Sequence, residues 1–281
     1  MTAALQPPPP AAPSAPPPAD DRARRSSSGR IALLVAGGVL TAAAIGWSVL
    51  SLIGLLAHDE DTVAIAFPAN VRHLVVRVDD GALHLRGTDA DHVSGTRHTS
   101  RGLVAPELDE TVIGDTLTLH ADCPGVMSEW CSVGYTLDVP ADVSVVASDD
   151  GDGIDVTGVR GDLDLSSTAG DFRDAGASGR LTLDSSAGGI EATGLSSQVV
   201  SAKSSAGEVT LSFDRPPDQV TAHSSAGGVD VVVPRSSPAY RVTARTSAGS
   251  TQVDVKTDPT SEQTISATSS AGPVSVTYGP G

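Results

Sequence analysis

The sequence predicts an all-β protein, a single-sheet-stack β-solenoid (β-helix) with coils of about 20 residues, preceded by one transmembrane helix. Three observations predict this fold. A Ser-Ser-Ala-Gly tetrapeptide recurs through the second half of the chain, small or apolar residues alternate with polar ones beside each copy, and residues 31–56 carry no charge. Recurrence at a nearly constant spacing is typical of solenoids, and alternation with a period of two is typical of strands.

The N-terminal segment, residues 1–30, is rich in Pro and Ala, and Met1 and Leu5 are its only large apolar residues. Such a segment cannot bury enough apolar surface to offset the entropy of ordering it. We therefore expect a disordered Pro-rich cytoplasmic tail. It could dock on an aromatic-lined groove of a partner, although a spacer is the simpler interpretation.

Residues 31–56 form the predicted transmembrane helix, because about 20 apolar residues span a bilayer. Four arginines precede this stretch, and the acidic sequence HDED follows it. Cytoplasmic flanks carry the excess of Arg and Lys. We therefore expect a single-pass protein of the cell membrane with a cytoplasmic N-terminus, and an extracytoplasmic domain over residues 57–281.

The charge balance excludes one class of partner. The chain has 18 Lys and Arg against 34 Asp and Glu, a formal net charge of −16. An acidic surface of this kind repels nucleic acid, so we expect no nucleic-acid partner.

Two cysteines, Cys123 and Cys131, enclose the loop CPGVMSEWC. Disulfides persist on the predicted outer side of the membrane, so we expect a structural disulfide. Free thiols or half of a metal site are the alternatives, but no His or Cys pair stands nearby to complete a zinc site. We expect no metal and no cofactor.

The repeat is regular over residues 148–279. Successive copies lie 18 to 23 residues apart, and a degenerate copy, SDDG, ends at Gly151. The other copies end at Gly170, Gly188, Gly207, Gly227, Gly249 and Gly272.

Alternation beside each copy predicts two short strands joined by a glycine corner. In the copy that ends at Gly207, we expect Ser204 and Ala206 to face a cramped interior and Ser205 to face solvent. The glycine would supply the positive φ of a sharp corner. Residues 62–147 show a similar but irregular pattern, so we expect them to form a leading region of the same domain.

These features resemble a known family. An apolar anchor, then the loop that ends in WC followed by SVGYTLDVP, then a ladder of SSAG coils, is similar to the DUF4097 family of adhesin-like β-strand-repeat proteins of bacteria. The resemblance covers about residues 62–279. It implies a β-solenoid on the cell envelope and brings no catalytic residues.

One outward column contains the candidate ligand-binding residues. Adjacent coils would place its side chains about 5 Å apart. Polysaccharide-cleaving β-helices use acid and base groups on one flank, but a solvated face has the same pattern and is the simpler interpretation. The column contains Asp184, Lys203, His223 and Arg245.

Two further candidates are weaker. Trp130 could form a binding tip, although covering a cap of the solenoid is the simpler role for an indole. Asp149, Asp150 and Asp152 lie among glycines, but calcium takes about six to eight oxygen ligands and the spacing of a calcium loop is absent. We favour an Asp-Gly turn over a weak calcium site.

The sequence therefore predicts a membrane-anchored, adhesin-like interaction or surface-structural module of the bacterial envelope, which binds a wall polymer or another envelope protein. We expect no catalysis, since no nucleophile elbow, phosphate loop or dinucleotide fingerprint is present. The alternatives are an accessory protein that senses envelope stress and signals through the Pro-rich tail, and a polysaccharide-active β-helix enzyme.

Overall fold

The computed structural model describes residues 37, 38, 40, 41, 44–48, 59–101, 104–124 and 131–279. The chain divides into two compact units, Met1–Ile53 and Gly54–Gly281. The described residues of the first unit are helical. Within the described part of the chain, no helix is both long and apolar enough to span a bilayer. The Pro-rich tail and most of the predicted transmembrane helix lie outside the described residues.

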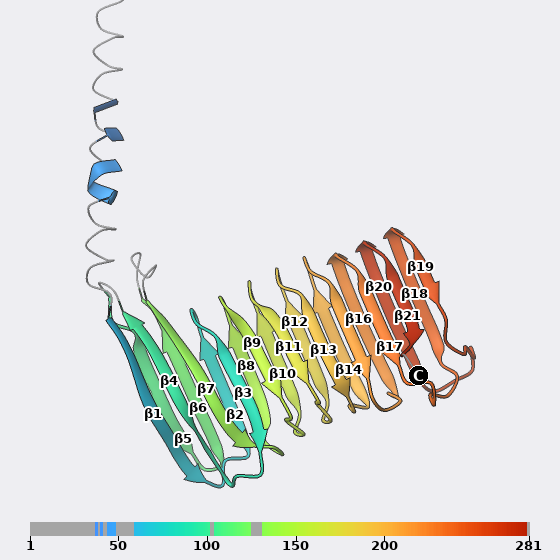
Figure 1. The fold of residues 1–281 in the computed structure, drawn as a ribbon, viewed down its shortest axis with the longest axis horizontal. Helices are drawn as coiled ribbons and strands as arrows, with labels where there is room; N and C mark the ends of the chain where they lie inside the picture. The colour runs from blue at the N-terminus through green and yellow to red at the C-terminus, as the bar shows by residue number, and fades with distance from the viewer. Residues whose placement is uncertain are drawn as a thin grey trace, which may run out of the picture. The chain divides into compact units, whose positions relative to one another are not determined.

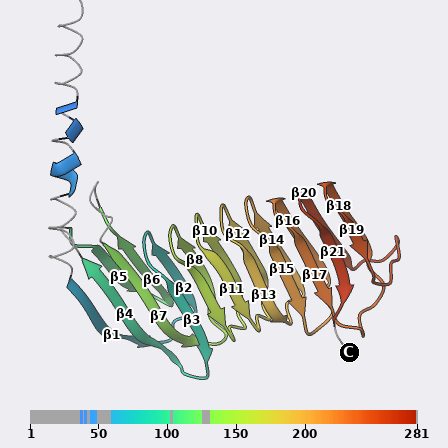
Figure 2. The ribbon, with the colours of Figure 1, turned by 45° about the horizontal axis from the view of Figure 1, so that its top comes forward.

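Two facing sheets make up the second unit (Figure 1, Figure 2). In spatial order, sheet A consists of β1 (Asp59–Ala69), β4 (His92–Arg101), β7 (Ser132–Pro140), β3 (Leu83–Thr88), β9 (Gly153–Thr157), β11 (Asp171–Ala175), β13 (Ile190–Leu195), β15 (Val209–Phe213), β17 (Val229–Val233), β21 (Val274–Tyr278) and β19 (Thr251–Val253). Sheet B consists of β18 (Arg241–Ala248), β20 (Thr264–Ala271), β16 (Gln219–Ala226), β14 (Val199–Ser204), β12 (Leu181–Ser185), β10 (Leu163–Ser167), β8 (Ser144–Asp149), β2 (His73–Val78), β6 (Thr116–Asp122) and β5 (Glu107–Ile113).

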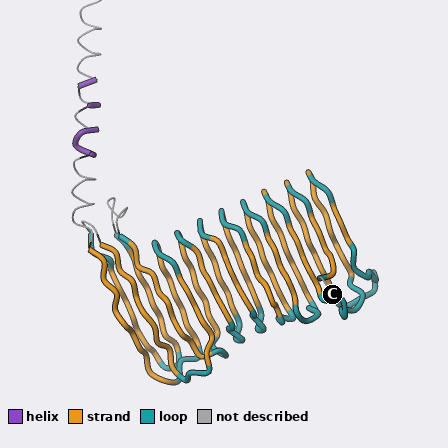
Figure 3. The backbone as a smooth tube through the Cα atoms, viewed as in Figure 1, coloured by secondary structure: helices purple, strands orange, loops and turns teal. Residues whose placement is uncertain are grey.

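Each coil contributes one strand to sheet B and, after a corner, one strand to sheet A (Figure 3). Neighbouring coils pair in parallel and in register, as where Leu183 lies opposite Ala202. This confirms the prediction of a mostly β protein. The expectation of a single sheet stack is wrong, because the corner carries the chain from one sheet to the other and the core lies between two sheets.

The core follows the predicted alternation up to the inward serine. In β14, Val200, Ala202 and Ser204 are 0–2% exposed. The next two residues, Ser205 and Ala206, are both exposed. The prediction that the alanines of the motif face the interior is therefore wrong. The corner starts directly after the inward serine, and a turn does not continue the alternation of a strand. The exposed alanines are Ala169, Ala187, Ala206, Ala226, Ala248 and Ala271.

The glycine of the motif is required by close stacking. A Cβ atom on Gly207 would lie 2.3 Å from the backbone oxygen of Gly188 in the preceding coil, and one on Gly188 would lie 2.0 Å from that of Gly170. Neither Gly188 nor Gly207 adopts a positive φ. At these two corners the predicted reason for the glycine is wrong, and contact between backbones excludes a side chain. Gly227, Gly249 and Gly272 do adopt a positive φ, as predicted.

The spatial order of the coils differs from their order in the chain at both ends. The last coil, β20–β21, lies between β16–β17 and β18–β19. The first coil, β2–β3, lies between β6–β7 and β8–β9.

Antiparallel strands complete the solenoid at its N-terminal end, where β4 pairs with β1 and β7 in sheet A and β5 pairs with β6 in sheet B. The predicted disulfide is present at the corner between β6 and β7, where it joins Cys123 to Cys131. Arg97 of sheet A forms an ion pair with Glu110 of sheet B, and the hydroxyl of the buried Tyr135 donates a 3.3 Å hydrogen bond to the same carboxylate. These contacts hold the two sheets together at this end.

Candidate functional site: a polar groove on sheet A

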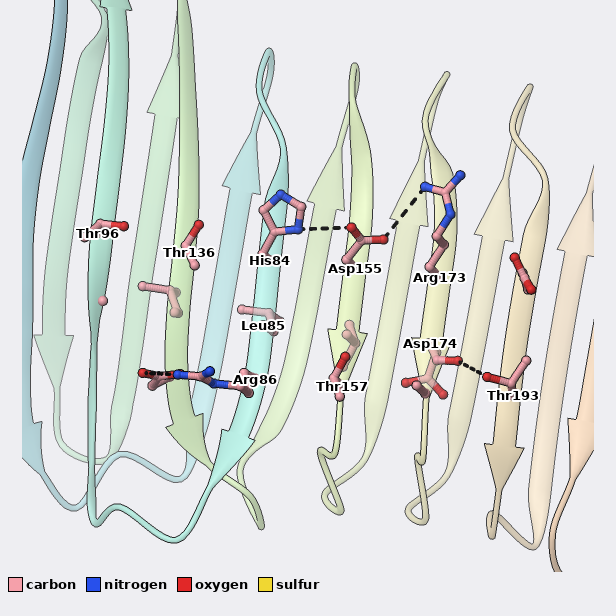
Figure 4. A pocket seen from close by; sticks show the side chains of 16 residues that line it. His84, Leu85, Arg86, Thr96, Thr136, Asp155, Thr157, Arg173, Asp174 and Thr193 are labelled. Carbon is pink, nitrogen blue, oxygen red and sulfur yellow. Dashed lines mark hydrogen bonds and ion pairs between the residues drawn. The ribbon is translucent and has the colours of Figure 1, made fainter.

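Two parallel rows of side chains cross the outer face of sheet A over β7, β3, β9, β11 and β13 (Figure 4). They are in register because the strands pair without a shift at these positions. The first row is Thr136, His84, Asp155, Arg173 and Glu191. The second row, two residues further along each strand, is Asp138, Arg86, Thr157, Ala175 and Thr193.

Basic and acidic side chains alternate along most of the first row. Nδ1 of His84 lies 3.0 Å from a carboxylate oxygen of Asp155, whose other oxygen lies 4.0 Å from the Arg173 guanidinium. Arg173 also lies 3.4 Å from the carboxylate of Asp171. Each group is partly exposed, so these pairs orient the side chains and contribute little to stability.

The second row begins with a bidentate ion pair. Nε and Nη2 of Arg86 donate to the two carboxylate oxygens of Asp138 at 2.7 and 3.0 Å. The hydrogen bonds to Asp138 raise the pKa of Arg86 above its usual value. The next residues, Thr157 and Ala175, are small and exposed.

A groove forms over these small residues, because the longer side chains of Arg86 and Arg173 rise beside them. Its volume is about 730 Å³. It runs across the strands, and therefore along the axis of the solenoid, and its lining combines hydrogen-bond donors of Arg and His with acceptors of Asp and hydroxyls of Thr. Such a surface can hydrogen-bond an extended polar molecule.

A buried carboxyl group lies beneath the groove. Asp174 alternates with Arg173 and points inward, where it is 4% exposed and its carboxyl oxygens make no hydrogen bond. Burial raises its pKa to about 7, and the nearby amide of Ala177 lowers it only in part. Its neighbours in register are Val156 and Ala192, so the carboxyl group interrupts an apolar column.

The outward column predicted from the sequence lies on sheet B, away from this groove. Asp184 is opposite Lys203, and Lys203 is opposite His223, as expected. Arg245 is not adjacent to His223. Thr268 of the inserted last coil lies between them and shares a 3.0 Å hydrogen bond with Nδ1 of His223. The prediction of a continuous charged column is wrong at this step.

Of the weaker candidates, Trp130 lies outside the described residues. The carboxylate of Asp149 accepts hydrogen bonds from the backbone N–H groups of Gly153, at 2.6 Å, and Gly151, at 3.3 Å. Asp149 is opposite the inward Ser167 of the next coil. Asp149 therefore serves as a corner residue. In the described parts of the chain, no group of three or more His, Cys, Asp or Glu residues could hold a metal ion.

Sequence reasoning missed the groove because the order of the coils creates it. His84 reaches Asp155 only because the first coil is inserted beside β9. The available signal was the pattern of 75–87, which resembles that of 145–158 and suggests that both segments belong to one ladder.

The fold and the groove define a class of protein, the two-sheet parallel β-solenoid with a polar groove on one outer face. Residues 142–278 match the model of the family described as Toastrack DUF4097, which confirms the resemblance noted in the sequence.

Solved structures similar to this chain share little sequence with it. One from Bacteroides fragilis, provisionally described as an adhesin, is 13% identical with a TM-score of 0.47, and the match covers 78% of this chain and 97% of that one. One from Clostridium sporogenes, provisionally described as a cell adhesion protein, is 12% identical with a TM-score of 0.36, covering 79% and 100%. A search of the curated proteins finds no match. We base no functional conclusion on these similarities.

Proposed function

We propose that this chain is an interaction module of the bacterial envelope, anchored by residues 31–56, whose groove on sheet A binds an extended, hydroxyl-rich partner such as a wall polymer. One observation carries the proposal: two in-register rows of charge-paired and hydroxyl side chains border a groove of about 730 Å³ that runs along the solenoid axis. Solenoids present long faces of this kind to extended partners.

The pairing of charges favours a particular chemistry. Arg86 and Arg173 each have a carboxylate partner, so neither offers an uncompensated charge to a densely anionic polymer. Sugar hydroxyls both donate and accept hydrogen bonds, as these pairs do. We expect binding without turnover, and another envelope protein is the alternative partner.

The test is a binding experiment with the full chain in detergent micelles, using isolated cell-wall polymer in a sedimentation assay and a glycan array. The Arg86→Ala/Arg173→Ala variant removes both walls of the groove. The Lys203→Ala/His223→Ala variant is the matched control, because it removes two polar side chains from sheet B. We expect the groove variant to lose at least about tenfold in affinity, or 1.4 kcal/mol, and the control to bind as the original chain does.

Two results would overturn the assignment. Loss of binding in the Lys203→Ala/His223→Ala variant alone would move the site to the column on sheet B. Absence of binding to any polymer or glycan would exclude a glycan-binding groove.

The anchoring is tested by cell fractionation. We expect the full chain in the membrane fraction, with the second unit digested by protease added to the outside of spheroplasts. Recovery of a chain lacking residues 31–56 in the same fraction would contradict the proposed anchor.

A further inference from the structure

At the C-terminal end of the solenoid, each sheet ends in a parallel edge strand that has a partner strand on one side. Among the described strands, β18 pairs only with β20, and β19 pairs only with β21. Directly before β18, Tyr240 pairs with the segment at Thr257, so the edge of β18 is open from Val242 onward. Arg241 donates its backbone N–H to Gln263 of the neighbouring coil. Because alternate residues of a parallel strand direct their amide groups to opposite sides, those of Val242 and Ala244 point to the open edge. Backbone groups of this kind can form hydrogen bonds with an added strand.

The apolar core is also open at this end. Val242 and Ala244 are only partly buried, whereas their counterparts one coil further in, Ile265 and Ala267, are 0–1% exposed. Val253 of β19 is 37% exposed. A cavity of about 550 Å³ opens here and is lined in part by Tyr240, Val242, Ala244, Val253, Val255 and Pro259.

The N-terminal end of the same solenoid presents the complementary surface. Its edge strands are β5 in sheet B and β1 in sheet A. Their inward apolar side chains are incompletely covered, with Leu108 37% exposed and Ile65, Phe67 and Val112 partly buried. Between Leu108 and Val112, the carboxylate of Glu110 also points inward and pairs with Arg97 of sheet A. Both ends therefore present the edges of two sheets and incompletely covered apolar side chains between them.

The two ends differ in charge. β18, with the sequence RVTARTSA, contains Arg241 and Arg245 and no acid. β5, with the sequence ELDETVI, contains three acids and no base, and β1 begins with Asp-Glu-Asp. A contact between two C-terminal ends would bring arginine against arginine, and a contact between two N-terminal ends would bring acid against acid. For these edge strands of sheet B, end-to-end contact in one direction is the arrangement that pairs opposite charges. In sheet A, Asp254 follows β19, so the contact with β1 adds no such pairing.

We propose that a second copy of this chain docks end to end, with the C-terminal edge of one solenoid on the N-terminal edge of the next. β18 would pair with β5 of the next copy in antiparallel fashion, because β5 runs opposite to the other strands of sheet B. β19 would pair in parallel with β1, which runs in the same direction as β7. The contact is heterologous, so it adds copies without closing and produces a linear stack.

The test measures the mass of the full chain in detergent micelles by sedimentation velocity over a range of protein concentrations. We expect a concentration-dependent ladder of species. Ala244→Pro removes an N–H that faces the open edge and none that donates to β20, so it should leave the far-ultraviolet circular dichroism unchanged and abolish the ladder.

Charge variants test the same contact without the Ala244→Pro substitution. Arg241→Glu/Arg245→Glu should weaken association at least tenfold, as should Glu107→Arg/Asp109→Arg. An equimolar mixture of the two variants should recover stacks in which the variants alternate, because each edge of one variant is then complementary in charge to the opposite edge of the other. Lys203→Glu, an exposed basic residue in the middle of sheet B, is the matched control and should associate as the original chain does.

A strictly monomeric chain at all concentrations would overturn the proposal. Association that persists in the Arg241→Glu/Arg245→Glu variant, or that is lost equally in Lys203→Glu, would also overturn it, because the contact would then not involve the basic edge.

Discussion

The hydroxyl of Ser204 donates a hydrogen bond of 3.0 Å to the backbone oxygen of Gly188 in the preceding coil. Ser224 makes the same bond to Gly207, at 2.7 Å. The inward serine of the motif therefore satisfies a corner carbonyl of its neighbour, and the repeated tetrapeptide joins successive coils.

Replacement of Ser204 by Ala should destabilise the solenoid by about 1 kcal/mol, because it removes a hydrogen bond between 2% exposed Ser204 and the Gly188 corner. Urea denaturation followed by circular dichroism measures the change. Ser205→Ala is the control, since Ser205 is exposed and its loss should alter the free energy of unfolding by less than about 0.5 kcal/mol. Equal effects of the two substitutions would contradict the inward position of Ser204.

Replacement of Gly207 by Ala should lower the free energy of unfolding by about 2–3 kcal/mol, because the added Cβ would lie 2.3 Å from the Gly188 backbone oxygen. Thermal unfolding measures it against Gly189→Ala, whose Cβ would meet only atoms at 3.6 Å. Ala206→Leu should be tolerated, since Ala206 is exposed. A larger loss of stability in Ala206→Leu than in Gly207→Ala would restore the original expectation of an inward alanine.

Replacement of Asp174 by Val should stabilise the protein at pH 8. The folded-state pKa is raised to about 7 from an ordinary value of 3.8, so the folded protein binds more protons than the unfolded chain between these values. Its stability must fall as the pH rises through that window. The free energy of unfolding of the variant should exceed that of the original chain by on the order of 2–4 kcal/mol at pH 8, and by much less near pH 4.

Urea denaturation at several pH values measures this effect. Asp164→Val is the control, because it makes the same substitution at an aspartate that is exposed on the outer face of sheet B. A difference between Asp174→Val and the original chain that stays constant from pH 4 to pH 8 would mean that Asp174 does not titrate in this range.

Reduction of the Cys123–Cys131 disulfide should lower stability by about 2–3 kcal/mol, because the bond closes a short loop and limits the unfolded chain. Thermal unfolding with and without a phosphine reductant measures this effect. The Cys123→Ser/Cys131→Ser variant should match the reduced protein and be insensitive to reductant. A reductant effect of the same size in that variant would show that the disulfide is not its cause.

Periodicity predicted the local structure well, because each coil repeats the same contacts. The alternation of Val200, Ala202 and Ser204 identified the inner face, since side chains of a strand point alternately to its two sides. It failed at Ala206, because alternation does not extend into a corner. Backbone proximity at Gly207 could not be read from the sequence, since it depends on how closely the next coil stacks.

The candidate site was harder to predict from the sequence than the local structure was. The residues of the column on sheet B were identified from their spacing, but the groove on sheet A joins His84 to Asp155 across residues 85–154. The pattern shared by residues 75–87 and 145–158 suggests that both belong to one ladder, but it does not fix which strands lie side by side, because the pairing depends on backbone amide groups that every residue has.

The sequence by itself determined that the chain forms β-coils, which side chains face the core up to the corner, and that Cys123 and Cys131 are close enough to pair. Only the tertiary structure decided the order of the coils. Similar coils offer nearly the same hydrogen bonds, so local chemistry does not distinguish the orders β16–β18–β20 and β16–β20–β18. The difference lies in burial: Ile265 and Val276 of the last coil are 0–1% exposed between two neighbours, whereas Val253, at the end of the stack, remains 37% exposed. Placing the more apolar coil inside removes the larger apolar area from water, which favours the observed order.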